Sequence, residues 1–494
     1  MASQDKPTFS AWLEWEYLKG EYVISNPNIE APLPGTPLEI KIWRDDDYKL
    51  EAKIYGKIKP ETPHATEQKD TLGEIVPSFS ISGEQGADQY ELGGCILGGS
   101  VEEYHPDADP TDGKFSTILH FQRIKIIQQK EANVEWLTEW YINGIKSSII
   151  FPRSTSREYK NIYSRKREVL KKGKETFDAR CHGSSSSDYA FIDCGDFGFI
   201  IQKVPDQLGP SWSENIGIEY RREFGGIPPP ETRLTISEIV SFILGKHLLN
   251  VGFSSYDSKG EYIEVVSVNP WGDNVRHLSQ SAGIPPIQIN SRGIIESILP
   301  PIINQYLQLR NPMKLDEVLW RYWIGSELPL GSNIPIMANG IEILSKYWYK
   351  SKKSKLKGIY LAKDKFDSIT QEEFEKIEIN LEKSIFKEKI MNKLKSCYSM
   401  TLTDRLKFFF SEIDLKIGDM EQEAINCRHK MIHSNVLTGD REIEKIIRLS
   451  YAYRCLFHRT LLKILGYSGK YIDYSMSGLP EKPIDDFVGT NEPN

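Results

Sequence analysis

The sequence predicts an α+β protein in which a β-rich region with antiparallel sheets, residues 1–310, precedes an all-α helical bundle, residues 311–480. Three observations support this division. Apolar and polar residues alternate with period two in the first part, Gly/Pro-rich breaks interrupt residues 206–310, and apolar residues recur at helical spacing from residue 311 to about 465. Residues 481–494 are expected to form a tail. A chain of 494 residues is long enough for two or three domains.

Alternating runs in the first part predict the strands. Residues 38–43 and 50–58 alternate on either side of the acidic turn 45–47. Period two with short polar connections is typical of antiparallel strands that have one wet face. Similar runs occupy 79–82, 115–127, 134–142, 148–151 and 190–203.

Two stretches of this region resemble nucleotide-binding or phosphate-binding signals. Residues 93–100, GGCILGGS, approach a phosphate-binding loop, but no lysine precedes Ser100, so turns and bulges in a strand are the preferred interpretation. The basic run 165–174 offers phosphate contacts, whereas a solvated loop or exposed helix is the preferred interpretation.

The sequence pattern changes within residues 206–310. A Gly/Pro break at 225–230 is followed by apolar positions at helical spacing in 236–244, and alternation returns at 262–266. The proline-containing pieces 283–286 and 300–301 indicate an approach to a boundary. We interpret 206–310 as the end of the β-rich module or as a small subdomain that closes it.

Amphipathic helices fill the rest of the chain and predict a compact bundle. Asp419, with Gln422 three residues on, is expected to cap the helix that carries Arg428 and His433. The apolar faces that define the helices lie at 315–322, 341–348, 374–394, 402–413 and 443–465.

Charge and cysteine content limit the function classes. The net charge of −7 gives no overall attraction to nucleic acid, so RNA contacts must depend on local basic patches. Six cysteines without C-x-x-C pairs fit a reducing compartment. The first residues lack a secretory signal layout, and the most apolar stretch, 236–249, is too short to span a bilayer. We expect a cytoplasmic protein without membrane contact.

The candidate site is Arg428 and His433, five positions apart in the late helix. Five positions rotate by about 140°, so the long arginine side chain must lean along the helix for both groups to touch one phosphate. A guanidinium presents a planar fork of donors to phosphate oxygens, and an imidazole moves protons near neutral pH. Together they are sufficient for RNA cleavage without a metal or other cofactor.

Two further patterns surround this pair. His429 and His433 form an H-x3-H pair that could hold zinc with Cys427 nearby, but no third ligand has a recognisable spacing, so we expect no metal. A lysine run follows the aromatic segment 347–349 and could guide RNA, although solvated lysines over buried aromatic rings are the preferred interpretation. The lysines are Lys350, Lys352, Lys353, Lys355 and Lys357.

A late R-x4-H element in a helical bundle resembles a HEPN domain, and its position behind a β-rich region resembles the ApeA-like anti-phage proteins. In HEPN nucleases an Arg-polar-x3-His element carries RNA cleavage, and Arg428, His429 and His433 match it. Many members have asparagine after the arginine, so His429 departs from the commoner choice and is a supporting residue here. The resemblance covers the carboxy-terminal third by motif and the β-rich part only by layout.

The resemblance implies an anti-phage ribonuclease of the abortive-infection type. It implies a homodimer with two facing elements, an RNA substrate, 2′,3′-cyclic phosphate products and a phage-derived trigger sensed through residues 1–310. The alternative is a non-catalytic HEPN adaptor or dimerisation protein with a ligand-sensing β-rich domain. In that case Arg428 and His433 form a structural pair.

Overall fold

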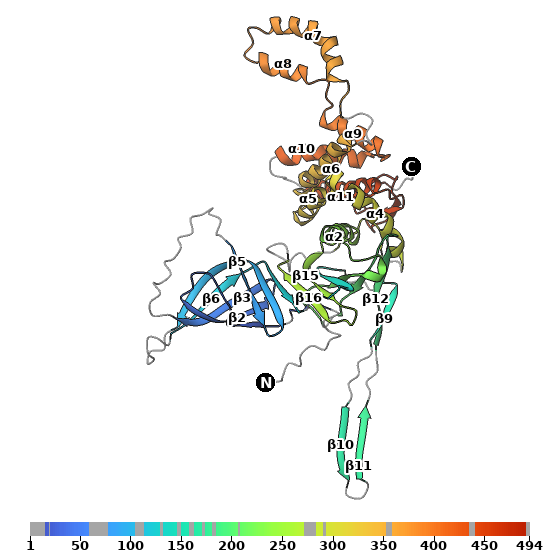
Figure 1. The fold of residues 1–494 in the computed structure, drawn as a ribbon. Coiled ribbons are helices and arrows are strands. Elements are labelled where there is room, and N and C mark those ends of the chain that lie inside the picture. Colours follow the sequence, from blue (N-terminus) through green and yellow to red (C-terminus); the bar gives the residue numbers. More distant parts are fainter. Residues whose placement is uncertain are drawn as a thin grey trace. The chain divides into compact units, whose positions relative to one another are not determined.

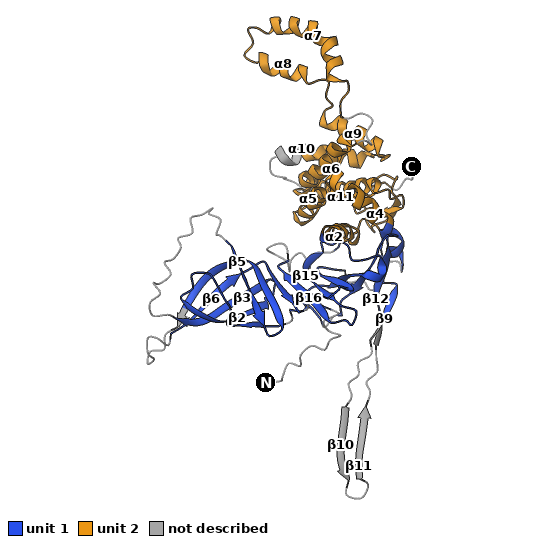
Figure 2. Cartoon of the chain, in the orientation of Figure 1, with its two compact units in different colours: residues 1–230, 246–283, 289–300 blue, residues 231–245, 284–288, 301–494 orange. Residues whose placement is uncertain are grey.

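In the computed structural model, the described residues are 15–18, 20–58, 78–103, 113–128, 132–145, 150–157, 163–169, 173–179, 184–205, 208–270, 283–289, 293–351, 358–433 and 440–490. Only the backbone is described at 102–103, 156–157, 163–169, 173–179, 184–186, 429–433 and 440. The chain forms two compact units (Figure 2). Unit 1 comprises residues 1–230, 246–283 and 289–300, and unit 2 comprises residues 231–245, 284–288 and 301–494.

Unit 1 is built on antiparallel strands, which confirms the predicted β-rich region (Figure 1). Among the described residues, fourteen strands share one sheet in the order β1-β2-β3-β6-β5-β7-β16-β15-β8-β14-β13-β12-β9, with β4 paired to β5. Its strands are β1 Tyr22–Ser25, β2 Gly35–Arg44, β3 Leu50–Ile58, β4 Phe79–Gln85, β5 Asp88–Glu103, β6 Lys114–His120, β7 Arg123–Ile127, β8 Trp136–Ile142, β9 Arg153–Arg157, β12 Ser184–Asp193, β13 Gly198–Lys203, β14 Ile216–Arg221, β15 Leu249–Tyr256 and β16 Tyr262–Val268. A separate pair joins β10 Tyr163–Val169 to β11 Gly173–Ala179.

The glycine-rich stretch 93–100 lies inside β5, as the strand interpretation predicted. The first part of β5 pairs with β7 and the later part pairs with β6, so this strand belongs to both halves of the sheet. At Gly94, where the pairing changes, φ is +69°, a backbone conformation that favours glycine. The register against β6 shifts between Leu97 and Ser100, which places a bulge at the second pair of glycines.

Three predicted strands need correction. The run 190–203 contains the end of β12 and all of β13, because the chain turns at 194–197, where the Cys194 N–H donates to the Phe197 carbonyl at 2.9 Å. The run 115–127 is two strands, β6 and β7, because the chain turns at Phe121 and Gln122, where the Gln122 N–H donates to the Gly93 carbonyl at 3.0 Å. Of the run 148–151, the described residues Ile150 and Phe151 are buried but precede β9 instead of forming a strand. The sequence resembles a strand here because Ile150 and Phe151 are apolar and are buried in the connection that precedes β9.

The apolar residues that alternate with polar ones along the strands form the core of unit 1. Inward-facing residues of β2 and β3 are fully or almost fully buried while their neighbours reach solvent. The cluster formed by the first strands includes Ile24, Ile40, Ile42, Leu50, Ile54, Ile81, Leu92, Phe115, Leu119, Ile124 and Ile126.

Unit 2 is mainly helical, as predicted (Figure 1). Its described helices are α2 Pro230–Leu244, α4 Ile294–Met313, α5 Leu315–Glu327, α6 Asn333–Lys350, α7 Lys363–Asn380, α8 Lys387–Lys395, α9 Leu402–Glu412, α10 Asp419–His433 and α11 Asp440–Ile464. The predicted apolar face 374–394 belongs to two helices, α7 and α8, which a turn separates. Among the described residues, no helix is both long and apolar enough to cross a membrane.

The units do not divide the chain at residue 310. Helix α2, which the sequence assigned to the β-rich region, belongs almost entirely to unit 2. Its Glu238 accepts hydrogen bonds from Arg310 Nε at 2.7 Å and from Tyr306 Oη at 3.0 Å, both on α4. Its Phe242 ring lies edge-on to Tyr322 of α5. These tertiary contacts, which sequence order does not report, join α2 to the helices.

The remaining boundaries differ as well. Pro300 and Pro301, which in the sequence indicate an approaching boundary, lie inside α4, and the division between the units falls between them. The expected tail is folded as far as residue 490. Strand β18, Glu481–Pro483, pairs with β17, Lys470–Ile472, and Val488 is completely buried.

Candidate functional site

Helix α10 carries Arg428, His429 and His433, and its start differs by one residue from the prediction. Gly418 precedes the helix, and its N–H donates to Glu421 Oε2 at 2.9 Å. This is one of the two hydrogen bonds of a capping box, in which the side chain at the third helical position accepts from the backbone N–H of the N-cap residue. Glu421, and not Gln422, occupies that position. Asp419 lies in the first turn, where negative charge is favourable. The carboxylate of Glu421 is a stronger hydrogen-bond acceptor than the amide of Gln422. This explains why the capping interaction, and with it the start of the helix, lies one residue earlier than predicted.

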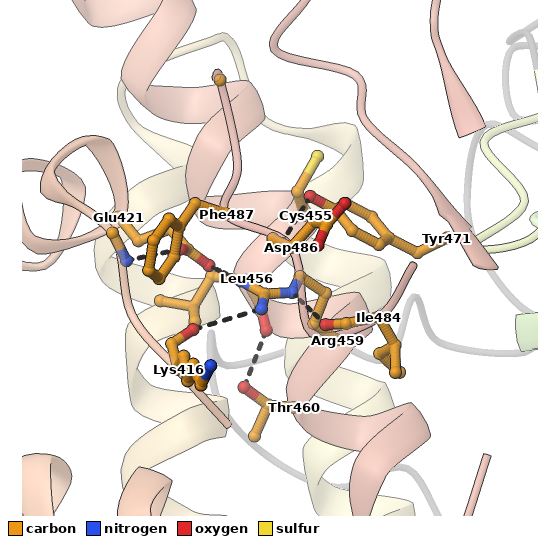
Figure 3. Close-up of polar contacts among 12 residues, drawn as sticks. Lys416, Glu421, Cys455, Leu456, Arg459, Thr460, Tyr471, Ile484, Asp486 and Phe487 are labelled. Carbon is orange, nitrogen blue, oxygen red and sulfur yellow. Dashed lines mark hydrogen bonds and ion pairs between the residues drawn. The ribbon is translucent and has the colours of Figure 1, made fainter. Parts of the chain in front are cut away.

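Glu421 also fixes the amino-terminal half of α10 to α11 (Figure 3). Its Oε1 bonds Arg459 Nη1, and both side chains are completely buried. The other guanidinium nitrogens donate to the carbonyls of Ile484 at 2.9 Å and Lys416 at 3.1 Å. Burial raises the pKa of Glu421, and Arg459 acts against that shift. Arg459 is therefore a core residue of unit 2.

Arg428 lies two turns after Glu421 and therefore on the same side of α10. The residue is 4% exposed, and its Nη1 forms an ion pair with Glu342 Oε1 on α6. The Glu342 side chain is 29% exposed, so this carboxylate reaches solvent while Arg428 hardly does. Burial raises the pKa of Tyr453 on α11, while Arg428 lowers it and Glu342 raises it, which places the phenol beside the pair.

The backbone of α10 is helical as far as His433, so the R-x4-H element lies on one helix as predicted. Five residues of helix separate the two Cα positions by about 7.5 Å along the axis and about 140° around it. The side chains of His429 and His433 lie outside the described residues. Convergence of Arg428 and His433 on one phosphate therefore stays a prediction.

The lysine run begins where α6 ends. Lys350 is the last residue of α6, and its Nζ lies 5.2 Å from the centre of the Tyr347 ring. Trp348 and Tyr349 are buried and bond to α9, through Trp348 Nε1 to Glu412 at 2.8 Å and Tyr349 Oη to the Arg405 carbonyl at 2.7 Å. Two of the three rings are thus core residues. The other four candidates, Lys352, Lys353, Lys355 and Lys357, lie outside the described residues.

His458 of α11 is another buried polar residue of this unit. It is completely buried, and its Nε2 lies 2.8 Å from Tyr322 Oη. Burial lowers its pKa well below the ordinary histidine value, and the positive charge of Arg454 lowers it further. The neutral ring is a core group of the bundle.

Metal ligation has no support in the described part of the chain, which contains no group of three or more His, Cys, Asp or Glu residues arranged to hold an ion. The His429 and His433 side chains are outside that search, so the zinc alternative stays open. Sequence reasoning missed Glu342. It lies 86 residues from Arg428, and nothing local distinguishes it from other surface glutamates of a helix.

Comparison of the chain with protein-family models, with curated proteins and with solved structures finds no match.

Proposed function

We propose that unit 2 is a metal-independent endoribonuclease in which Arg428 and His433 act on one phosphodiester. The observation that supports this most directly is the Arg428–Glu342 ion pair. It fixes a guanidinium on α10, in the last two turns before His433. A catalytic cation needs a partner on a second rigid element to restrict its rotamers, and α6 supplies one.

The chemistry assigned to these residues is a transesterification. The ribose 2′-oxygen loses its proton and attacks phosphorus, the bond from phosphorus to the 5′-oxygen breaks, and that oxygen gains a proton. His433 takes the first proton or supplies the second. Arg428 stabilises the extra negative charge at the phosphorus centre. The products are a 2′,3′-cyclic phosphate and a free 5′-hydroxyl, and two copies of the chain would supply two such elements.

We further propose an anti-phage setting in which unit 1 restrains unit 2 until a phage component is sensed. The support is the division into a β-rich and a helical unit, together with the R-x4-H element. Deleting residues 1–310 is a poor test of restraint, because that deletion removes α2 and the first part of unit 2. Point variants in unit 1 that release toxicity in growing cells would test it instead.

The experiment that tests the nuclease is cleavage of total cellular RNA by the full chain in the presence of a chelator. We expect 2′,3′-cyclic ends with wild type, a loss of about 100-fold or more with His433→Asn, and normal cleavage with His120→Asn, a variant of an exposed histidine in unit 1. Equal cleavage by wild type and His433→Asn would refute the assignment. Loss of all cleavage with chelator would refute the metal-free mechanism.

A non-catalytic adaptor is the second candidate, and the burial of Arg428 favours it. A guanidinium that is 4% exposed and paired with a carboxylate is also what a purely structural ion pair requires. If the adaptor function applies, RNA is not cut even after the phage component is added, and Arg428 variants change only stability or dimerisation.

A further inference from the structure

Helices α7 and α8 form a hairpin within unit 2 (Figure 1). The chain enters and leaves this hairpin at one place, because Ile359 and Ser399 form an antiparallel bridge and the Tyr360 N–H donates to the Tyr398 carbonyl at 2.9 Å. The structure describes every residue from 358 to 400. The hairpin is therefore an excursion of the chain from a single point of unit 2.

The inner face of the hairpin buries little of either helix. Between ring centres, Phe366 of α7 lies 5.8 Å from Phe374 and 5.7 Å from Tyr398. Nevertheless, none of the 18 residues of α7 is buried, and α8 has one buried residue, Met391. Most helical stability in proteins comes from packing of an apolar face, and an isolated helix is marginal in water. These helices therefore indicate a partner beyond the contacts that one copy of the chain supplies.

Exposed apolar side chains are concentrated on this hairpin. Sixteen large apolar residues of the described part of the chain are exposed, and five of them lie within residues 369–390. Ile379 is 70% exposed and Phe386 is 57% exposed. Single apolar residues scattered over a surface need no explanation, whereas a concentration of them marks an interaction site. The five residues are Ile369, Ile379, Ile385, Phe386 and Ile390.

Acidic residues accompany the exposed isoleucines of α7. This helix has six acidic and three basic side chains. Glu372 follows Ile369 by three positions and Glu375 precedes Ile379 by four, so each carboxylate shares a helix face with an exposed isoleucine. These four residues are the outer face of α7.

Helix α8 has the same arrangement with the opposite charge. It has four lysines and one glutamate. Lys389 follows Phe386 by three positions, and Lys393 follows Ile390 by three, so each ammonium group lies beside an exposed apolar side chain. These four residues, Phe386 at the start of the helix included, are the outer face of α8.

Little of this charge is balanced inside the hairpin. Among the described residues, one ion pair joins the two helices, from Lys387 Nζ to Glu378 Oε1 at 3.5 Å. The charged residues of the two outer faces are exposed and form no ion pair with any described residue. In a two-fold pair of hairpins, the outer face of α7 in each copy meets the outer face of α8 in the other. Apolar side chains then meet apolar ones, and carboxylates meet lysines.

We propose that the α7–α8 hairpin binds the same hairpin of a second copy of the chain, with the outer face of α7 against the outer face of α8, in a four-helix arrangement. Charge complementarity favours this partner. An anionic membrane or an RNA suits the lysines of α8, but the carboxylates of α7 repel it. The inference does not depend on the ribonuclease proposal, because neither Arg428 nor His433 takes part. If both are correct, this contact holds together the two copies that carry the R-x4-H elements.

The test is sedimentation equilibrium of the full chain and of two charge-reversed variants. We expect wild type at twice the chain mass of 56.6 kDa. Glu372→Lys/Glu375→Lys and Lys389→Glu/Lys393→Glu should each raise the dissociation constant of the dimer at least about 10-fold, because like charges then face each other at both contacts. An equimolar mixture of the two variants should form heterodimers with an affinity within about threefold of wild type, because each α7 again meets an α8 of opposite charge.

A variant of an apolar residue tests the rest of the interface. Phe386→Asp should weaken the dimer about 10-fold through loss of apolar contact, while aspartate remains a favourable residue before the first turn of α8. Leu234→Asp, at a 54% exposed leucine of α2, is the matched control and should leave the dimer unchanged. A monomeric wild type, a mixture that does not recover association, or a monomer that binds phosphatidylserine vesicles through Phe386 would each overturn the proposal. Sedimentation measures association without RNA, so its result is independent of nuclease activity.

Discussion

Arg428 of α10 and Glu342 of α6 form an ion pair in which the cation is 4% exposed and the anion reaches solvent. Any phosphate that approaches Arg428 meets this carboxylate at the same guanidinium. Glu342 therefore orients Arg428 and also competes with an anionic substrate for its guanidinium. Both effects can be measured separately.

Replacing Arg428 by lysine separates catalysis from structure. The lysine retains the positive charge beside Glu342, but it loses the planar fork that matches a phosphate. We expect RNA cleavage to fall about 100-fold or more while the melting temperature stays within a few degrees of wild type. Cleavage at the wild-type rate by Arg428→Lys would reduce this residue to a structural ion-pair partner.

Replacing Glu342 by glutamine removes the negative charge that competes with phosphate for Arg428. Removing a negative charge next to the phosphate position should tighten RNA binding about three- to tenfold, measured by fluorescence anisotropy in a His433→Asn background that cannot cut. The same change should lower the free energy of unfolding by about 1–3 kcal/mol, because Arg428 loses its carboxylate. Glu378→Gln on α7, an exposed helix, is the control. Unchanged RNA affinity would show that phosphate does not approach Arg428.

The pair Glu421–Arg459 should dominate the stability of α10 (Figure 3). Arg459→Ala leaves a completely buried carboxylate without its cation and should cost about 3–5 kcal/mol of unfolding free energy. The double variant Glu421→Leu/Arg459→Leu should be less destabilised than Arg459→Ala, because it leaves no unpaired charge. Urea unfolding of the three proteins measures this. A double variant less stable than Arg459→Ala would contradict the explanation.

Buried histidine should make the fold sensitive to acid. An unfolded histidine binds a proton near pH 6.5, whereas folded His458 does not, because burial lowers its pKa well below that value. The unfolded state then binds more protons below about pH 6.5, so stability falls as pH falls. From pH 7.5 to 5.5 we expect a loss of about 1 kcal/mol from this residue. His247 of unit 1, whose pKa burial lowers to about 4, acts in the same direction.

The pH dependence can be assigned with two variants. His458→Gln should flatten the decline of the melting temperature between pH 7.5 and 5.5, whatever its effect at neutral pH. His120→Gln changes an exposed side chain and should leave the decline as in wild type. If the slope is the same in all three proteins, His458 does not contribute.

Local patterns in the sequence predict the class of the fold, many of the strands and most of the helices; strands such as β14 and β15 were missed. Period-two alternation in β2 and β3 and helical spacing in α5, α6, α9 and α11 are local patterns, because each records which face of one element is buried. The R-x4-H element and its helical setting were also readable. Helix α4 was missed because Pro300 and Pro301 indicate a break, whereas its neighbouring residues Leu299 and Ile303 are buried and the helix continues through the two prolines.

The assignment of elements to units and the surroundings of each candidate residue depend on tertiary contacts. Helix α2 belongs with α4 and α5 because Glu238 and Phe242 have their partners there. Glu342 meets Arg428 from 86 residues away, and Glu421 meets Arg459 from 38 residues away. Such contacts depend on how elements pack in three dimensions, and a pattern within one element carries no information about the side chain opposite it.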